Sequence, residues 1–498
     1  MSMPFVDREF TFTQPDGSKL QVRGTGNQHQ ATFTTLDGYT VVREPVSGFY
    51  QYAREVGIAH PQPTGIRAGA TAPSALGLPP AVKPPSTSSG GQAFVSAGLP
   101  RSRSRWQVRR EQFRLQSLAA IANGVAAPAP PQRQTVGTFV GLCLLVQFPD
   151  EPGTISEAEV DDFCNKPGYS GFGNNGSMRD YFFDVSDGKL TYTNIVAPWY
   201  TATKPKTYYT DEAVEYPLRA RELILETLAF HRAQGFDFSS LTVDSQRFIY
   251  AINVFYAGMR TNNWSKGLWP HAYHLQAPVQ LAPGKLANDY QITDMSSELT
   301  LGTFCHENGH MICDFPDLYD YGNESNGVGH YCLMCGGANA NPKNPTRVGA
   351  YLRHAAGWAT KVSGMPAGAS ISLAADRNEF GLLRRNRTQY FIVENRAQVG
   401  RDASIPDAGL AIWKIDETGN NSNEAMTADS HYECSLVQAD GLTDLEMGAN
   451  NGGPGDLYGQ GAVFSSQSRP GSTWWDGTAS GLNIRNISAP GPVITFST

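Results

Sequence analysis

Two histidines and a glutamate form the part of this sequence best suited to chemistry, in the segment His306-Glu307-Asn308-Gly309-His310. On a helix, side chains four residues apart lie one turn apart and differ by only about 40° around the axis. His306 and His310 could therefore hold one metal ion between their imidazoles. Glu307 would project beside the ion, where a carboxylate can take a proton from an activated water. This spacing predicts a hydrolytic zinc site.

The residues around this segment favour the helix that such a metal site requires. Apolar side chains recur on one face of the expected helix, at Leu301, Phe304, Cys305 and Ile312. Ser296 or Ser297 can cap its start, because a serine oxygen accepts hydrogen bonds from the first free N–H groups. We therefore expect a helix over residues 297–312.

A catalytic zinc usually has three protein ligands, so another side chain must return to the ion after the helix ends. Asp314, Asp317 and Asp320 are the nearby candidates. Cys332 and Cys335 form a CxxC pair, but no second pair completes a four-thiolate zinc site. We expect a structural role for the two cysteines.

The longer segment resembles a known family. Residues 306–320 read HENGHMICDFPDLYD, and Gly327-Val328-Gly329 and Cys332-Leu333-Met334 follow. This order is similar to the immune inhibitor A type of secreted zinc metallopeptidases, in which an aspartate-bearing turn and then a methionine turn follow the zinc helix. By match, the resemblance implies Asp317 as the third zinc ligand and Met334 beneath the metal.

One departure from the family pattern leaves Asp320 as the alternative ligand. The family commonly has glycine three residues after the second histidine and aspartate three residues later. This chain has Cys313, then Asp314, and one extra residue. Asp314 could adopt the left-handed conformation that glycine would otherwise supply, so that the following box can still fold back.

Further blocks carry the resemblance over roughly residues 135–498. Blocks before the zinc segment are residues 176–182, 185–189, 198–200, 256–258 and 269–271. Blocks after it are residues 391–396, 409–416 and 438–441. The resemblance implies that a strand before the zinc helix lines the cleft and pairs with extended substrate.

Composition divides the chain into four parts. Residues 1–60 alternate polar and apolar stretches around Asp16-Gly17 and Asp37-Gly38, which predicts a small β-rich module. Residues 61–134 are rich in Pro, Ala, Ser and Arg, which predicts a linker whose arginines offer processing points. We expect the catalytic domain in residues 135–360 and a β-rich domain in residues 361–498, where short strand-like runs alternate with turns.

Within these parts, several segments have the pattern of a particular element. An apolar run at residues 139–148 predicts a strand buried on both faces, and residues 248–256 predict a second strand. Pro217 can begin a helix with apolar side chains at three-and-four spacing. The expected fold class is α+β. The resemblance implies a zincin or metzincin-like catalytic domain with a twisted sheet and an active-site helix, preceded by a prosegment and followed by an all-β region.

Residues 14–17 and 37–40 are also similar to the prosegment of many secreted members of this family. Such a prosegment implies a latent precursor, which removal of the residues before about 135 would activate. No cysteine precedes Cys143, so a thiolate from the prosegment cannot block the zinc. A carboxylate such as Asp16, an imidazole such as His29, or steric plugging stay open as the means of latency.

Charge and hydropathy limit the partners of the 498-residue chain. Its net charge of −7 gives no general basic field, so we expect no nucleic-acid partner. No apolar run reaches the roughly 18 to 20 residues of a membrane span, and the first residues show no export signal. Secretion is implied by the resemblance alone. Asp320, Asn323 and Glu324 carry oxygens that calcium prefers, and family members are often calcium-stabilised, so structural calcium is a further expectation.

Together these features predict a zinc endopeptidase acting on proteins or peptides. Zinc held by His306, His310 and Asp317 would polarise a water and the scissile carbonyl, and Glu307 would pass the water proton to the leaving amine. Two alternatives stay open. One is a zinc amidohydrolase with a non-protein substrate, and the other is a secreted binding or adhesion protein with a decayed site, against which the intact Glu307 speaks.

Overall fold

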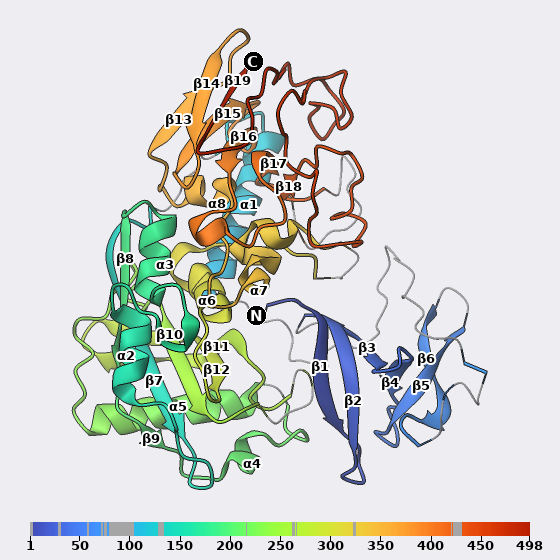
Figure 1. The fold of residues 1–498 in the computed structure, drawn as a ribbon. Helices are drawn as coiled ribbons and strands as arrows, with labels where there is room; N and C mark the ends of the chain where they lie inside the picture. Colours follow the sequence, from blue (N-terminus) through green and yellow to red (C-terminus); the bar gives the residue numbers. More distant parts are fainter. Residues whose placement is uncertain are drawn as a thin grey trace.

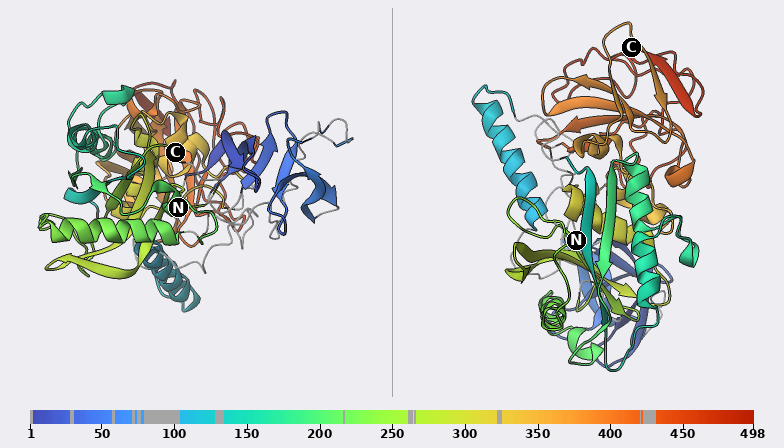
Figure 2. Two further views of the ribbon diagram at one scale, coloured as in Figure 1. Left: turned by 90° about the horizontal axis from the view of Figure 1, so that it is seen from below. Right: turned by 90° about the vertical axis from the view of Figure 1, so that its left-hand side faces the viewer.

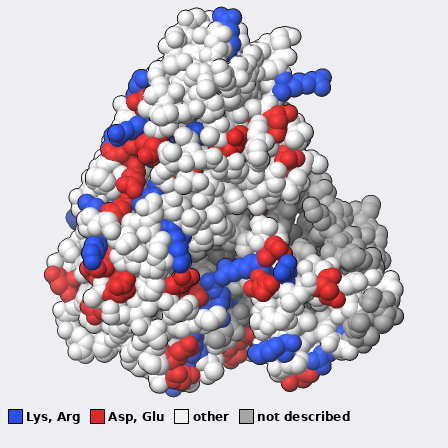
Figure 3. Space-filling model, in the orientation of Figure 1, with Lys and Arg blue, Asp and Glu red and all other residues white. Residues whose placement is uncertain are grey.

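The structure is a computed structural model that describes most of the chain. The described residues are 3–27, 31–56, 59–70, 73, 77–78, 104–127, 134–215, 217–260, 264, 266–321, 325–419, 421 and 431–498. They combine several β-sheets with a few helices, a mixed structure compatible with the expected α+β class (Figure 1). No helix of the described residues is long and apolar enough to cross a membrane. Acidic and basic side chains are interspersed over the face shown in Figure 3.

The N-terminal strands form one antiparallel meander in the order β1-β2-β3-β4-β5-β6. Their bounds are β1 (Phe5–Thr13), β2 (Lys19–Gly26), β3 (Ala31–Thr35), β4 (Thr40–Arg43), β5 (Tyr50–Val56) and β6 (Ala59–Arg67). Gly17 and Gly38 have φ of 84° and 89°, the left-handed conformation that the expected tight turns need. Phe12 and Phe33 on one face share a core with Trp264 and Trp269, so the meander packs against the following part of the chain.

The central sheet has the order β11-β12-β10-β7-β8, with β9 beside β7. Its strands are β7 (Gly137–Gln147), β8 (Leu190–Val196), β9 (Tyr200–Thr201), β10 (Ile252–Ala257), β11 (His271–Ala282) and β12 (Lys285–Met295). Strands β7, β8, β10 and β12 run parallel, and β11 is antiparallel to β12. Strand β7 is buried on both faces, as its apolar run predicted, because Cys143 and Leu145 face one core while Leu142 and Leu144 face the other.

Strand β10 begins later than the expected 248–256. Phe248 belongs instead to a turn, in which the N–H of Asp244 donates to the Phe248 carbonyl and Arg247 has φ of 73°. The chain reverses there, and only from Ile252 does it run beside β7.

Helices cover both faces of the central sheet. They are α2 (Glu157–Asn165), α3 (Met178–Val185), α4 (Lys206–Tyr209), α5 (Leu218–Ala233), α6 (Leu301–Cys313), α7 (Ala338–Ala340) and α8 (Ala350–Ala355). Side chains of α2, α3 and α6 share the core of one sheet face, and those of α5 share the core of the other. The helix expected at Pro217 is α5, which begins at Leu218 with Pro217 as its N-cap.

The C-terminal strands form a sheet in the order β13-β15-β16-β17-β18 and a pair, β14-β19. Their bounds are β13 (Lys361–Gly364), β14 (Ser370–Ala374), β15 (Glu379–Arg384), β16 (Gln389–Arg396), β17 (Gly409–Asp416), β18 (Cys434–Leu436) and β19 (Val493–Ser497). Ile392 and Trp413 share the core of α6, whereas Phe391 and Ile412 pack with β14 and β19. The core beneath α6 therefore continues into the C-terminal sheet.

Strand β6 and helix α1 (Arg105–Ala122) contain residues of the segment expected as a linker. In the right-hand view of Figure 2, one end of α1 lies against the body of the molecule and the other end projects away from it. The segment therefore contains an ordered helix whose first turns contact the rest of the chain.

Candidate metal centre

The expected metal-binding helix is α6, and it starts later than the sequence indicated. Its N-cap is Thr300 rather than Ser296 or Ser297. Strand β12 runs to Met295, and residues 296–300 carry the chain from the sheet to the helix, with Leu299 buried in the core on the way. The two serines therefore lie in the connection and cannot cap the helix.

The end of α6 agrees with the prediction made for Asp314. This residue has φ of 56° and ψ of 30°, the left-handed conformation, and its N–H donates to the carbonyl of His310. An aspartate adopts this conformation more readily than most residues with a side chain. The chain then reverses, so that Phe315 and Asp317 return along the helix.

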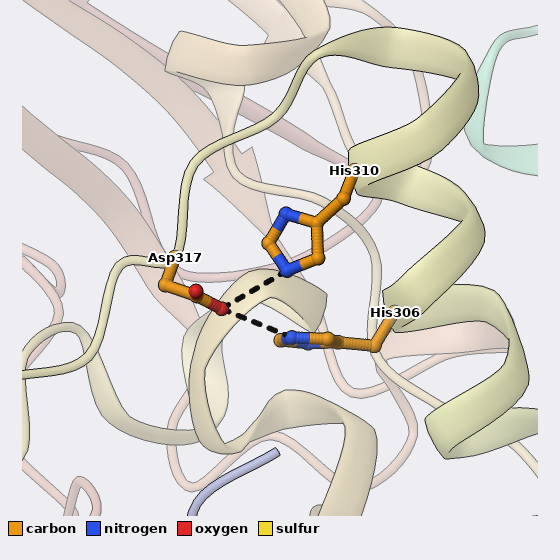
Figure 4. A group of neighbouring side chains, drawn as sticks. All are labelled: His306, His310 and Asp317. Carbon is orange, nitrogen blue, oxygen red and sulfur yellow. Dashed lines mark hydrogen bonds and ion pairs between the residues drawn. The ribbon is translucent and has the colours of Figure 1, made fainter. Parts of the chain in front are cut away.

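Three side chains meet at this reversal, and Figure 4 shows them pointing toward one another. His306 and His310 lie one turn apart on α6, with ring centroids 4.9 Å apart. The Nε2 atoms of both rings lie 3.1 Å from Oδ1 of Asp317. Among the described residues these three form the one group of His, Cys, Asp or Glu close enough to share a metal ion.

The donor atoms of this group fit zinc. Four ligands placed tetrahedrally at about 2.0–2.1 Å from zinc lie roughly 3.3 Å from one another. Nδ1 of His306 lies 2.9 Å from the Leu333 carbonyl, and Nδ1 of His310 lies 2.6 Å from the Phe315 carbonyl. Each ring can donate from Nδ1, which leaves the Nε2 lone pair for a metal.

Asp317 is oriented by Tyr321, whose hydroxyl donates to Oδ2 at 2.6 Å. This contact leaves Oδ1 facing the histidines. Burial opposes the ionisation of Asp317, but the two histidines outweigh it and hold the pKa of this carboxyl far below its usual range. For His306, burial lowers the pKa, yet the hydrogen bond and charge of Asp317 produce a net rise. The site therefore favours the ionised form of Asp317, which is the form that ligates a metal.

Asp320 makes a different contact from Asp317. Its Oδ2 accepts the N–H of Ser325 at 3.0 Å, within the turn that follows the site. Asp320 is also one of the three oxygen-bearing residues expected near calcium. The other two, Asn323 and Glu324, lie outside the described residues.

Glu307 lies on α6 next to His306 and is buried, with 1% of its surface exposed. Its charge is among the causes that raise the pKa of His306, which places the carboxylate close to the metal group. Both neighbours of Glu307 are buried as well. A base in this position would act out of contact with bulk solvent.

Met334 packs against α6 at Gly309, the residue directly before His310. A Cβ built on Gly309 would come within 2.9 Å of the Met334 sulfur, so glycine allows this close approach. The carbonyl of Met334 accepts the N–H of Leu318 at 2.8 Å, and the preceding carbonyl of Leu333 contacts His306. The loop around Met334 therefore supports both the helix and the turn that carries Asp317.

The CxxC pair lies in the same loop. Cys332 and Cys335 are buried and form no disulfide. Burial is the largest cause that raises the pKa of Cys332 to about 11 and of Cys335 to about 12. Both thiols therefore stay protonated near neutral pH, and neither belongs to the metal-binding group found among the described residues.

Sequence reasoning missed several residues that position the site. Of the tyrosines that follow α6, Tyr331 donates its hydroxyl to Asp456 in the C-terminal region at 3.1 Å. The ring of Tyr319 lies 6.5 Å from that of His306. Tyr321 contacts the site directly. Its place four residues after Asp317 was a weak signal, because a turn of unknown shape separates the two.

Asn308 was also missed, although it belongs to the central motif. The Tyr192 hydroxyl donates to its Oδ1 at 2.6 Å, and its Nδ2 donates to Oδ1 of Asn253 at 2.9 Å. These buried bonds join α6 to strands β8 and β10. A polar residue inside an otherwise apolar helix face was the only signal for this network.

Asp16 lies away from the metal group. Its carboxylate pairs with Arg67 at 2.6 Å within the N-terminal meander, so it does not act as the blocking ligand considered above. His29, the other residue considered, lies outside the described residues. Other contacts connect residues before 134 with the site. Asn27 donates to the Tyr321 carbonyl at 3.2 Å, and Trp106 stacks on His310.

Comparison with known proteins adds no assignment. No protein-family model matches the chain, and no curated protein matches it either.

Proposed function

We propose that this protein is a zinc-dependent endopeptidase with a metzincin-like catalytic domain. One observation carries the proposal: the two histidines of an HExxH helix meet a carboxylate from the following turn, with both Nε2 atoms 3.1 Å from one oxygen. His306, His310 and Asp317 would hold the metal. A bound zinc ion would supply a Lewis acid that polarises a carbonyl and acidifies a water.

The role of Glu307 follows from its place beside the ligands. Its carboxylate would take a proton from the attacking water and deliver it to the leaving amine as the peptide bond breaks. The burial of Glu307 and of its neighbours supports this role, since a proton held there is not lost to bulk water.

The arrangement of the central sheet supports a peptide as substrate. Strand β11 is antiparallel to its neighbour β12, whereas the other strand pairs in this sheet are parallel. An extended peptide can pair with an edge strand of a sheet through main-chain hydrogen bonds, and β11 is the last strand at one end of the described order of this sheet. A protein or peptide chain is therefore the substrate class that we propose.

We further infer that the chain is a secreted, latent precursor. The resemblance supports secretion, and the burial of the site supports latency. His306 and His310 have no exposed surface, and Asp317 is 5% exposed. A cavity of about 1340 Å³ beside the start of α6 is bordered partly by β1, so the N-terminal meander occupies space next to the site. Structural calcium near Asp320 stays a prediction.

Hydrolysis of casein tests the proposal. The samples are the full chain, a form cleaved near residue 135, and the Glu307→Ala variant of that cleaved form. We expect the cleaved parent to be active. The variant should bind zinc but turn over about a hundred- to ten-thousand-fold more slowly, the usual contribution of a general base.

Glu298→Ala is the matched control, because Glu298 precedes α6 and pairs with Lys343. It should keep the parent activity. Equal activity in Glu307→Ala would contradict the mechanism. Zinc binding without hydrolysis in any form would favour the binding-protein alternative, and hydrolysis of small amides without proteolysis would favour the amidohydrolase.

A further inference from the structure

Helix α1 begins directly against the metal site. Ser104 caps the helix and forms a capping box with Gln107. Trp106 is 4% exposed, and its ring stacks on His310 with centroids 4.4 Å apart and planes inclined by 10°. The indole thus covers one face of an imidazole that we expect to ligate zinc.

Arginines of α1 hold this position through acidic residues from other elements. Arg105 pairs with Asp244 at 2.8 Å, and its backbone N–H donates to Asp289 of β12 at 3.0 Å. Arg109 donates from Nε to Asp314, the residue that ends α6, at 2.9 Å. We name Asp244, Asp289, Asp314 and Glu433 the acidic rim.

Arg110 extends the same contact into the C-terminal region. Its guanidinium pairs with Glu433, a member of the acidic rim that also accepts the Tyr351 hydroxyl. Arg105 and Arg109 lie one turn apart on the same side of the helix, since side chains four residues apart are neighbours, and Arg110 follows Arg109 directly. Several ion pairs and hydrogen bonds therefore hold the first two turns of α1 in place around the site.

The rest of α1 makes fewer contacts, among them a hydrogen bond from Nε of Arg114 to the Thr418 carbonyl at 3.1 Å. Trp106 and Ser117 are its only buried residues, while Leu115 is 53% exposed and Ile121 is 49% exposed. Figure 2 shows the far end of the helix projecting from the molecule. Apolar side chains exposed along a helix are unusual in a permanent part of a core. This pattern is expected of a helix that dissociates from the rest of the molecule when the contacts of its first two turns are broken.

We propose that α1 is the inhibitory element of the precursor. Trp106 occupies the space over His310, and the acidic rim binds the arginines of α1 in place of substrate. The inference rests on the proposed function, because it assumes that the metal site acts on substrate. It assigns latency to a helix in the segment 61–134 and to aromatic and ionic contacts, without a blocking ligand on the metal.

The test uses the full, uncleaved chain loaded with zinc. The variants are Trp106→Ala, Arg109→Gln and the control Val108→Ala, whose side chain is 39% exposed on the same helix. The first measurement is the rate at which the chelator dipicolinate removes zinc, which needs no activity. We expect removal to be roughly tenfold faster in the first two variants, as expected for loss of one aromatic or charge-assisted contact, and unchanged in the control.

The second measurement is casein hydrolysis by the same uncleaved proteins, and it separates the two proposals. Faster zinc removal with hydrolysis supports both. Faster removal without hydrolysis in any form, cleaved or uncleaved, leaves α1 as the cover of the site and overturns the peptidase function. Removal rates equal to the parent overturn the inference about α1, whatever the activity of the cleaved form. Arg109→Gln carries the test if Trp106→Ala does not fold, because the Arg109 side chain is 32% exposed.

Discussion

At the scale of single residues, the position of each atom proposed to bind metal depends on a hydrogen bond made by another atom of the same side chain. The two imidazoles are oriented through Nδ1 by the carbonyls of Leu333 and Phe315. The carboxylate of Asp317 is oriented through Oδ2 by the Tyr321 hydroxyl. Partners of this kind are known to tune metal affinity as well as ligand geometry.

Replacing Tyr321 by phenylalanine should weaken metal binding. Loss of the 2.6 Å hydrogen bond frees Asp317 to rotate, so we expect zinc affinity to fall about 10- to 100-fold, measured by competition with a fluorescent chelator. Tyr169→Phe is the matched control, because the Tyr169 hydroxyl donates to Glu159 at 2.7 Å, in a contact that involves none of the metal-binding residues. Equal affinity in the two variants would show that Tyr321 does not position the ligand.

At the scale of elements, helix α6 is held at its C-terminal end, through hydrogen bonds of Asn308, and by the packing of Met334. Asp314 ends the helix in the left-handed conformation, and Asn308 joins it to two strands. Met334 packs where a side chain at Gly309 would stand. These contacts come from different parts of the chain. Together they fix the position and orientation of α6, and therefore of both histidines.

The backbone conformation of Asp314 gives a stability prediction. Asp314→Gly and Asp314→Ala both remove the ion pair with Arg109, so their difference isolates the cost of a Cβ at φ of 56°. We expect the alanine variant to unfold with a free energy about 1 kcal/mol lower than that of the glycine variant. Urea denaturation measures the difference. Equal midpoints would indicate that the helix end relaxes to a right-handed turn.

Asn308→Ala should destabilise the protein through the buried hydrogen bonds that it removes. The Tyr192 hydroxyl and Oδ1 of Asn253 would each lose one partner, which costs about 1–1.5 kcal/mol for each bond, in addition to the cost of the cavity left by the side chain. We expect the free energy of unfolding to fall by about 2–4 kcal/mol. Asn175→Ala provides the comparison, because exposed Asn175 bonds one surface amide, and surface changes usually stay within about 0.5 kcal/mol. Similar losses in the two variants would argue against the network.

At the scale of the whole molecule, the part built on the central sheet and the C-terminal part share one core and several buried charges. Ile392 and Trp413 of the C-terminal sheet pack in the core of α6. Arg110 of α1 pairs with Glu433, and Glu417 lies nearby, bonded to the Tyr390 hydroxyl at 2.8 Å. Changes of charge in this region should therefore affect the unfolding of the molecule as a unit.

Glu417 makes stability depend on pH. Burial is the largest cause that raises the pKa of this carboxyl to about 8, from an ordinary value of about 4.3. Between these values the folded protein keeps a proton that the unfolded chain has lost, so this contribution to stability is full below pH 4.3 and disappears as pH rises through 8. The slope approaches about 1.4 kcal/mol per pH unit.

Thermal melts between pH 5 and 9 test this dependence, with Glu417→Gln as the comparison. Glutamine has no proton to lose, so the variant should gain stability relative to the parent as pH rises. Parallel curves for the two proteins would contradict the raised pKa of Glu417.

Local features of the chain were predictable because short-range geometry determines them. The four-residue spacing of His306 and His310 places both rings on one side of any helix, and α6 is that helix. The left-handed end at Asp314 and the doubly buried strand β7 also followed from residue type and local pattern. The predicted starts of α6 and β10 were wrong. A connecting segment precedes α6 and a turn precedes β10, and residue propensity does not specify where either one ends.

Contacts between distant segments were decided by the tertiary structure. The residues alone left Asp314, Asp317 and Asp320 as candidate ligands, with Asp317 implied by the resemblance, and the shape of the intervening turn brings Asp317 to the histidines. Likewise, no spacing connects Trp106 with His310 or Tyr192 with Asn308. Helical periodicity repeats every few residues, so it can be recognised in a short stretch of sequence. A contact across a hundred or more residues depends on how whole sheets and helices pack, which is settled by the burial of many side chains at once.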